Sequence, residues 1–126
     1  MRLKLSAFAI TDLHGIQVRE RAILRKAIET LKVDPYPDGP YGNIEVSSIP
    51  VRVFAQDVPL VHRLKSEKPK TGYRVLYIVD EDHDTVLVVM VRPRDAAYPK
   101  TEIGKSMVRR IVKNYFDHKG WENDFH

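Results

Sequence analysis

Hydrophobic and polar positions repeat with two different periods along the chain, and these periods predict its secondary structure. Apolar residues alternate with polar ones over residues 2–9, which is typical of a strand. Leu24, Ile28 and Leu31 instead fall at helical spacing, and charged residues occupy the other side of the same segment. We therefore predict a first strand at the N-terminus and an amphipathic helix over residues 16–32.

The segments around this helix are less regular. A short helical turn over residues 11–14, with Thr11 or Asp12 as its cap, is expected to precede it. Residues 34–43 hold three prolines and two glycines, a composition that ends helices and central strands and therefore predicts a loop. Residues 44–54 resemble a strand that Pro50 would restrict to a sheet edge or a bulge.

The second half of the chain shows the clearest pattern. Strands are predicted over residues 60–65, 73–79 and 86–92, joined by the polar turns SEKPKTG and DEDHDT. Consecutive strands on such short connections form an antiparallel meander. Apolar residues at every fourth position predict a helix over residues 102–117, which Gly120 ends.

This order of elements predicts an α+β fold. We expect a small antiparallel sheet, made of the three-strand meander and the N-terminal strand, with the helices packed on one face. The chain has 126 residues, of which 43% are hydrophobic, enough for one core. We expect a single domain over residues 1–117 and a C-terminal tail over residues 118–126.

Composition narrows the cellular setting. No stretch approaches the roughly 18 consecutive apolar residues of a membrane helix. The N-terminal apolar run is too short and too interrupted for a signal peptide. Cysteine is absent, so disulfides and thiolate metal sites are excluded. These features predict a cytoplasmic protein that makes no contact with a membrane.

Positive charge is concentrated in two segments. The chain has a net charge of +4, yet residues 60–74 and 92–113 together hold twelve basic residues against three acidic ones. The rest of the chain is net acidic. A phosphate-binding surface requires such segregation, although two solvated faces that never meet would give the same count.

Several kinds of catalytic site are excluded. The five histidines lack metal-ligand spacing and are expected at the surface, and the acidic turn over residues 80–85 lacks the glycine and glutamate of a calcium loop. That turn is expected to be a solvated hairpin tip. Nucleotide-binding glycine motifs are also absent, since Gly104-Lys105-Ser106 lacks the upstream glycine of a phosphate-binding loop. We predict neither a metal nor a cofactor.

Basic residues on the predicted strands remain as the candidate chemistry. Neighbouring strands lie about 4.8 Å apart, so side chains from the three strands of the meander can converge. The alternative is that some of these cations pair with aspartate or glutamate elsewhere. The candidate set consists of Arg63, Lys65, Arg74, Arg92, Arg94 and Tyr98.

The segment TGYRVLYIVDEDHDTVLVVMVRPRDAAY resembles the RelE/ParE toxin superfamily. The similarity lies in a Gly-Tyr-Arg strand that starts at Gly72, an acidic turn, an apolar strand, and a basic segment in which Arg94 stands four residues before Tyr98. It covers roughly residues 1–115. Pro93 between two arginines departs from the family pattern, as do the longer segment 38–57 and the C-terminal tail.

The resemblance implies the toxin of a type II toxin–antitoxin system, a metal-independent endoribonuclease that cleaves messenger RNA on the ribosome by attack of the 2′-OH. By similarity, Arg74 would contact the phosphate, Lys65 would act as base, Arg92 or Arg94 would stabilise charge, and Tyr98 would stack on a base. Arg63, Lys68 and Lys70 would bind RNA. A cognate antitoxin is the implied protein partner.

Two other functions fit the same resemblance. The ParE branch inhibits DNA gyrase and has no nuclease activity, and a third possibility is an inactive module that binds antitoxin or nucleic acid. The complete set of basic residues and Tyr98 favours cleavage, whereas Pro93 weakens that preference.

Overall fold

The computed structural model of the chain describes residues 1–38, 43–45, 52–53, 56–57, 61–64, 71–93, 102–117 and 123–124. Side chains are described for residues 1–38, 61–64, 71–93 and 106–116. The elements follow in the order β1 (Arg2–Leu5), α1 (Ala7–His14), α2 (Val18–Thr30), β2 (Asn43–Glu45), β3 (Arg52–Val53), β4 (Gln56–Asp57), β5 (Val61–Leu64), β6 (Tyr73–Asp80), the 3-10 turn η2 (Glu81–His83), β7 (Thr85–Pro93), α3 (Glu102–Asp117) and β8 (Asn123–Asp124).

The main sheet has the strand order β2-β5-β6-β7-β1-β8, and β3 and β4 form a separate two-stranded hairpin. Strands β5, β6 and β7 form the predicted antiparallel meander. The N-terminal strand β1 instead pairs with β7 in parallel, with Leu3 opposite Val86. A parallel neighbour requires a long crossover connection, which α1, α2 and the following segments provide. The sheet is therefore mixed, although its central strands are antiparallel.

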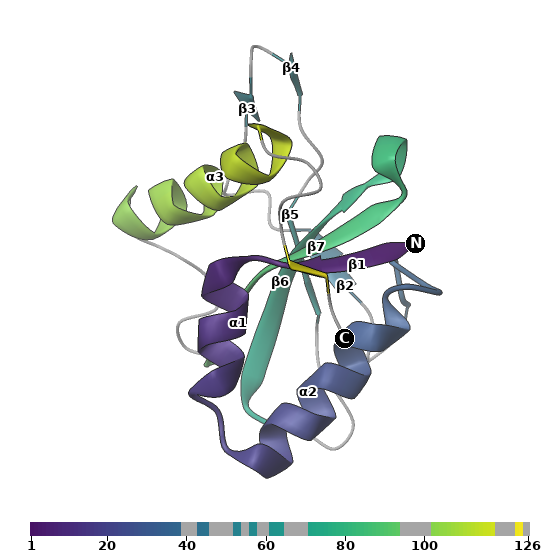
Figure 1. The fold of residues 1–126 in the computed structure, drawn as a ribbon, viewed down its shortest axis with the longest axis vertical. Helices are drawn as coiled ribbons and strands as arrows, with labels where there is room; N and C mark the ends of the chain where they lie inside the picture. The colour runs from purple at the N-terminus through teal and green to yellow at the C-terminus, as the bar shows by residue number, and fades with distance from the viewer. Residues whose placement is uncertain are drawn as a thin grey trace.

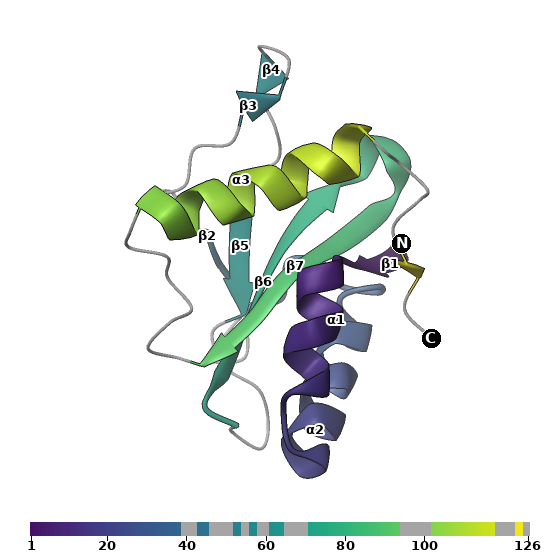
Figure 2. The same cartoon turned by 60° about the vertical axis from the view of Figure 1, so that its left-hand side comes forward.

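Helices cover both faces of the sheet (Figures 1 and 2). The buried side chains of β6 divide alternately between these two faces. Val75, Tyr77 and Val79 pack with the buried residues of α1 and α2. Leu76 and Ile78 pack with the buried residues of α3. The α+β class and the meander are thus confirmed, but the prediction of helices on one face is wrong, because β6 is apolar on both faces and each face needs a cover.

The two N-terminal helices form for local reasons. Ser6 caps α1, since its Oγ accepts a hydrogen bond of 3.0 Å from the backbone N–H of Ala9. The helix therefore begins at Ala7, whereas the sequence analysis placed only a turn at residues 11–14 and a longer strand before it. Leu24 and Ile28 bury one face of α2 against the sheet, as their spacing predicted.

The division into one domain and a tail stays a prediction. Within the range expected to be a tail, β8 pairs with β1, with Lys4 opposite Asp124 and Leu5 opposite Asn123. Among the helices within the described ranges, none is both long and apolar enough to cross a membrane.

Candidate functional site

Three arginines of the meander lie on the same face of the sheet. Arg74 on β6 is directly opposite Arg92 on β7. Arg63 on β5 is opposite Leu76, which places it diagonally next to Arg74 on the same face. Helix α3 packs on this same face, at the end of the sheet nearer the β6–β7 hairpin (Figure 2). We call Arg63, Arg74 and Arg92 the arginine row.

A bulge in β7 brings Arg92 into this row. Leu76 pairs with Met90 and Tyr77 with Val88, so that Val89 is an extra residue without an opposite partner on β6. Before the bulge, Val88 faces α1 and α2, and after it Val91 faces the same side. A strand without the extra residue would turn Arg92 toward α1 and α2 instead, because successive side chains alternate.

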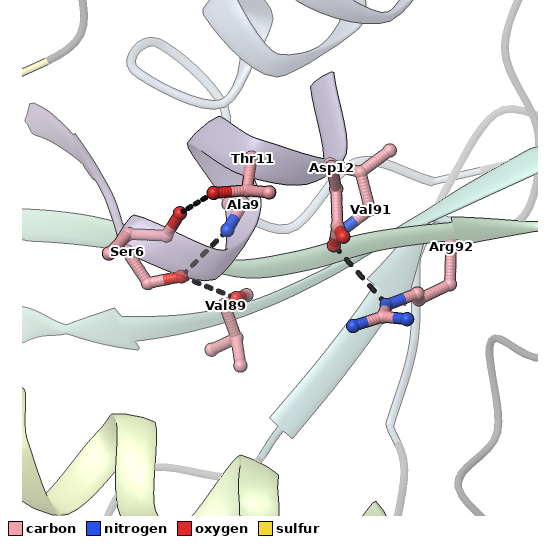
Figure 3. Close-up of polar contacts among 8 residues, drawn as sticks. Ser6, Ala9, Thr11, Asp12, Val89, Val91 and Arg92 are labelled. Atoms are coloured by element: carbon pink, nitrogen blue, oxygen red, sulfur yellow. Dashed lines mark hydrogen bonds and ion pairs between the residues drawn. The ribbon is translucent and has the colours of Figure 1, made fainter. Parts of the chain in front are cut away.

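Like charges directly opposite each other on neighbouring strands destabilise a sheet. Among the described residues, Asp12 supplies a negative charge beside the Arg74–Arg92 pair. Asp12 of α1 places its Oδ2 atom 3.3 Å from Nε of Arg92, and the same oxygen accepts a hydrogen bond of 3.0 Å from the backbone N–H of Val91 (Figure 3). Arg92 therefore pairs with an aspartate, which was the alternative considered for the basic residues of the meander.

The pKa of Asp12 is raised from its ordinary value. Burial of the carboxyl group raises it, and this effect exceeds the opposing effects of the hydrogen bond from Val91 and of the positive charge of Arg92. The negative charge of Asp12 is therefore held in a partly desolvated position at the edge of β7.

Arg74 is the least exposed member of the row. Only 7% of its surface is accessible, and its Nη1 donates a hydrogen bond of 2.7 Å to the backbone carbonyl of Tyr73. This contact uses one of the five N–H donors of the guanidinium group. Arg63 is half-buried. The planar fork of a guanidinium group matches the geometry of a phosphate, which can accept two hydrogen bonds from it at once.

The rest of the predicted site lies outside the described residues. This applies to Lys65, Lys68, Lys70, Arg94 and Tyr98. Their roles remain predictions, and among the predicted site residues whose side chains are described, Arg63, Arg74 and Arg92 lie together. Within the described residues, no group of three or more histidine, aspartate or glutamate side chains could hold a metal ion.

Two buried polar clusters were not predicted from the sequence. His62 was expected at the surface but is 7% exposed, because it points to the opposite face from Arg63 and stacks on Tyr77 with ring centroids 5.4 Å apart. Tyr36 meets the same imidazole edge-on at 5.5 Å. The alternation of β5 could have indicated the position of His62, because consecutive residues of a strand point to opposite faces and Arg63 follows it directly.

The second cluster lies at the hairpin that was expected to be a solvated tip. Asp80 is buried and accepts a hydrogen bond of 2.8 Å from the hydroxyl of Tyr115 on α3. His83 Nδ1 lies 2.8 Å from the same carboxylate oxygen. This prediction was wrong for Asp80, because α3 covers the end of the hairpin, whereas residues 81–84 are exposed as expected.

Comparison with solved structures identifies the fold. The chain is similar to a chain of the archaeal RelE–RelB complex from Pyrococcus horikoshii OT3, with a TM-score of 0.57 and 17% identity over 76% of this chain and 97% of that one. It is also similar to an arginine-to-alanine double mutant of the E. coli toxin RelE in the free state, with a TM-score of 0.52 and 17% identity over 90% and 98% of the two chains. No protein-family model and no curated protein matches the chain.

Proposed function

Starting from this RelE-like fold, we propose that the chain is the toxin of a toxin–antitoxin pair and that it cleaves messenger RNA on the ribosome without a metal. The observation that carries the proposal is the arginine row, in which Arg74 stands directly opposite Arg92 on the sheet. Two cations at such positions repel each other, and an anionic ligand between them removes that repulsion.

The concentration of guanidinium groups in the row supports a phosphate ligand. Arg63, Arg74 and Arg92 lie on one face of the sheet, and Asp12 is paired with Arg92. A phosphodiester adds a further negative charge and accepts several hydrogen bonds at once. The pentavalent transition state of RNA cleavage carries more negative charge than the substrate, so the same arginines bind it more tightly.

The proposed reaction needs no external reagent. The 2′-oxygen of a nucleotide loses its proton and attacks the adjacent phosphorus, a new P–O2′ bond forms, and the P–O5′ bond breaks. The 5′-oxygen takes up a proton, and the products are a 2′,3′-cyclic phosphate and a 5′-hydroxyl end. The enzyme has to remove one proton, supply another and stabilise the charged phosphorane.

We assign the roles as follows. Arg74 contacts the non-bridging phosphate oxygens through its guanidinium group, and Arg92 stabilises the charge of the phosphorane. By the family resemblance, Lys65 is the base that removes the 2′-proton, Arg94 assists at the leaving oxygen, and Tyr98 stacks on a base of the message. Loss of one such transition-state contact costs about 10²-fold in rate or more.

The expected partners follow from the same proposal. One solved structure of this fold is a complex of RelE with RelB, and we extend this arrangement to the present chain, with an antitoxin covering the basic face. The other is a mutant in which two arginines two positions apart are replaced by alanine, the same spacing that separates Arg92 from Arg94. Lys68, Lys70 and Arg63 would add contacts to ribosomal RNA or message.

Primer extension on a reporter message, after induction of the chain in cells, tests the proposal. We expect discrete cuts within translated codons for the wild type and none for Arg74→Ala. Arg92→Ala is a second variant, useful because its side chain is more exposed than that of Arg74 and its loss disturbs the fold less. Arg110→Ala removes an exposed arginine of α3 and serves as the matched control, which should still cut.

The outcomes separate the proposal from its alternatives. Growth arrest with an intact message would contradict cleavage and point to gyrase inhibition. Normal growth with a soluble, folded chain would contradict toxicity altogether. Cuts that persist in both Arg74→Ala and Arg92→Ala would show that the arginine row is not the site.

A further inference from the structure

Helix α1 replaces a strand along part of the edge of β7. Strand β1 pairs with β7 as far as Leu5 opposite Val88. Beyond that point, the Ser6 hydroxyl donates a hydrogen bond of 2.5 Å to the carbonyl of Val89, and Asp12 accepts the N–H of Val91 at 3.0 Å. Two side chains of one short helix segment thus satisfy backbone groups that a neighbouring strand would otherwise pair.

Asp12 has a second contact that this backbone role does not require. Its Oδ2 atom also lies 3.3 Å from Nε of Arg92, and the two terminal nitrogens of that guanidinium lie on the side away from Asp12 (Figure 3). Those nitrogens carry four of the five N–H donors of an arginine. The carboxylate therefore engages the inner nitrogen and leaves the outer ones for an anion.

The hydrogen bond to Val91 does not require a charged side chain. Asparagine at position 12 has the same size, and its amide oxygen accepts the N–H of Val91 in the same way. Burial raises the pKa of Asp12, which means that the carboxylate form is disfavoured by desolvation at this position. The contact with Arg92, rather than the hydrogen bond to Val91, is therefore what a carboxylate at position 12 specifically provides.

We propose that Asp12 is a positioning residue for Arg92, holding the guanidinium through Nε so that its terminal N–H groups face the scissile phosphate. The inference rests on the proposed function, since it names a further residue that the cleavage site needs. Asp12 also offsets the repulsion between Arg92 and Arg74 before a substrate arrives. Arg92 is then ordered in advance, and binding does not have to order it.

The proposal predicts a particular kinetic effect. Without the carboxylate, Arg92 must be ordered each time the transition state forms, which lowers the cleavage rate by about 3- to 10-fold. Because Arg92 is assigned to the phosphorane rather than to ground-state binding, the toxin concentration at half-maximal rate should not change. A purely structural role of Asp12 would instead reduce the amount of folded toxin and leave the rate of the folded fraction intact.

A double-mutant cycle on purified full-length chains tests this, with single-turnover cleavage of message on programmed ribosomes as the assay. Asp12→Asn should lower the maximal rate about 3- to 10-fold in the wild-type background and have no effect in the Arg92→Ala background. Asp82→Asn, which removes the same charge from an exposed position on the η2 turn, is the matched control. An equal loss in both backgrounds, or no loss in either, would overturn the proposal.

A second measurement does not depend on cleavage. In ¹⁵N-labelled protein, the Nε–H resonance of Arg92, assigned by its loss in Arg92→Ala, should be protected from exchange in the wild type and exchange faster in Asp12→Asn. Unchanged exchange would refute the positioning contact. Protection without any cleavage by the wild type would refute the proposed function instead, so the two failures are distinguishable.

Discussion

The hydroxyl group of Tyr115 provides a sharp test of how α3 is held on the sheet. This hydroxyl donates a hydrogen bond of 2.8 Å to Asp80 at the end of β6, and both residues are buried. Replacing Tyr115 by phenylalanine removes one oxygen atom and keeps the ring, including its edge-on contact with Phe116 at 5.0 Å. The substitution therefore isolates the hydrogen bond from the packing.

The expected loss follows from the kind of bond removed. A hydrogen bond to a charged group contributes about 1.5–3 kcal/mol, and its deletion leaves a buried carboxylate with one acceptor site unfilled. The remaining contact to His83, at 2.8 Å, limits the loss to this range rather than the larger cost of an isolated buried charge. With an unfolding entropy of about 2.1 cal/mol/K per residue, the 126-residue chain should lose about 6–11 °C in melting temperature.

Urea and thermal denaturation followed by circular dichroism measure this loss. Tyr36→Phe is the matched control, because the Tyr36 hydroxyl also donates to a carboxylate, that of Glu81 at 2.9 Å, but at an exposed position. Water replaces the lost partner there, so the change should stay within about 0.5 kcal/mol. A Tyr115→Phe variant as stable as Tyr36→Phe would refute the conclusion that burial makes the Tyr115–Asp80 bond important.

Three further predictions concern the core, the stability of the fold at alkaline pH and the hairpin turn. Leu24→Ala on the buried face of α2 should destabilise the fold by about 2–5 kcal/mol in urea denaturation, whereas Val18→Ala at an exposed position of the same helix should stay within about 0.5 kcal/mol. Burial and the neighbouring Glu81 raise the pKa of Tyr36 to about 12. Since this pKa lies above the ordinary value of 10.0, the contribution of Tyr36 is full below pH 10 and is lost as pH rises toward 12. Because Tyr36 is exposed, solvent screening keeps this contribution within about 0.5 kcal/mol, and Tyr36→Phe should flatten that small loss in denaturation curves measured across this range. Asp84 adopts a left-handed conformation with φ 48° and ψ 47°, so Asp84→Val should cost about 1 kcal/mol or more while Asp84→Gly costs none, as thermal melts would show.

Local periodicity explains which parts of the fold the sequence could predict. The meander and the helices α2 and α3 were predicted close to their observed bounds, because each has a strong alternating or helical pattern of its own. The regular spacing of apolar residues within α3 also identified the side that packs on the sheet. Most of helix α1 was not predicted, because residues 2–9 alternate like a strand. The helix begins after Ser6, whose hydroxyl both caps it and donates a hydrogen bond to the Val89 carbonyl of β7, a contact that the sequence pattern does not reveal.

The candidate site divides in the same way. The sequence by itself determined that Arg63, Arg74 and Arg92 lie on three successive strands, since those strands are defined by their own patterns and joined by short turns. Only the tertiary structure decided that all three point to one face. The segment VLVVMVR is apolar throughout before Arg92, so nothing in it marks the bulge at Val89 that turns Arg92 toward Arg74. Asp12 is 80 residues away along the chain, and its contact with Arg92 exists because α1 takes the place of a strand at the edge of β7, a pairing between distant segments that no local pattern encodes.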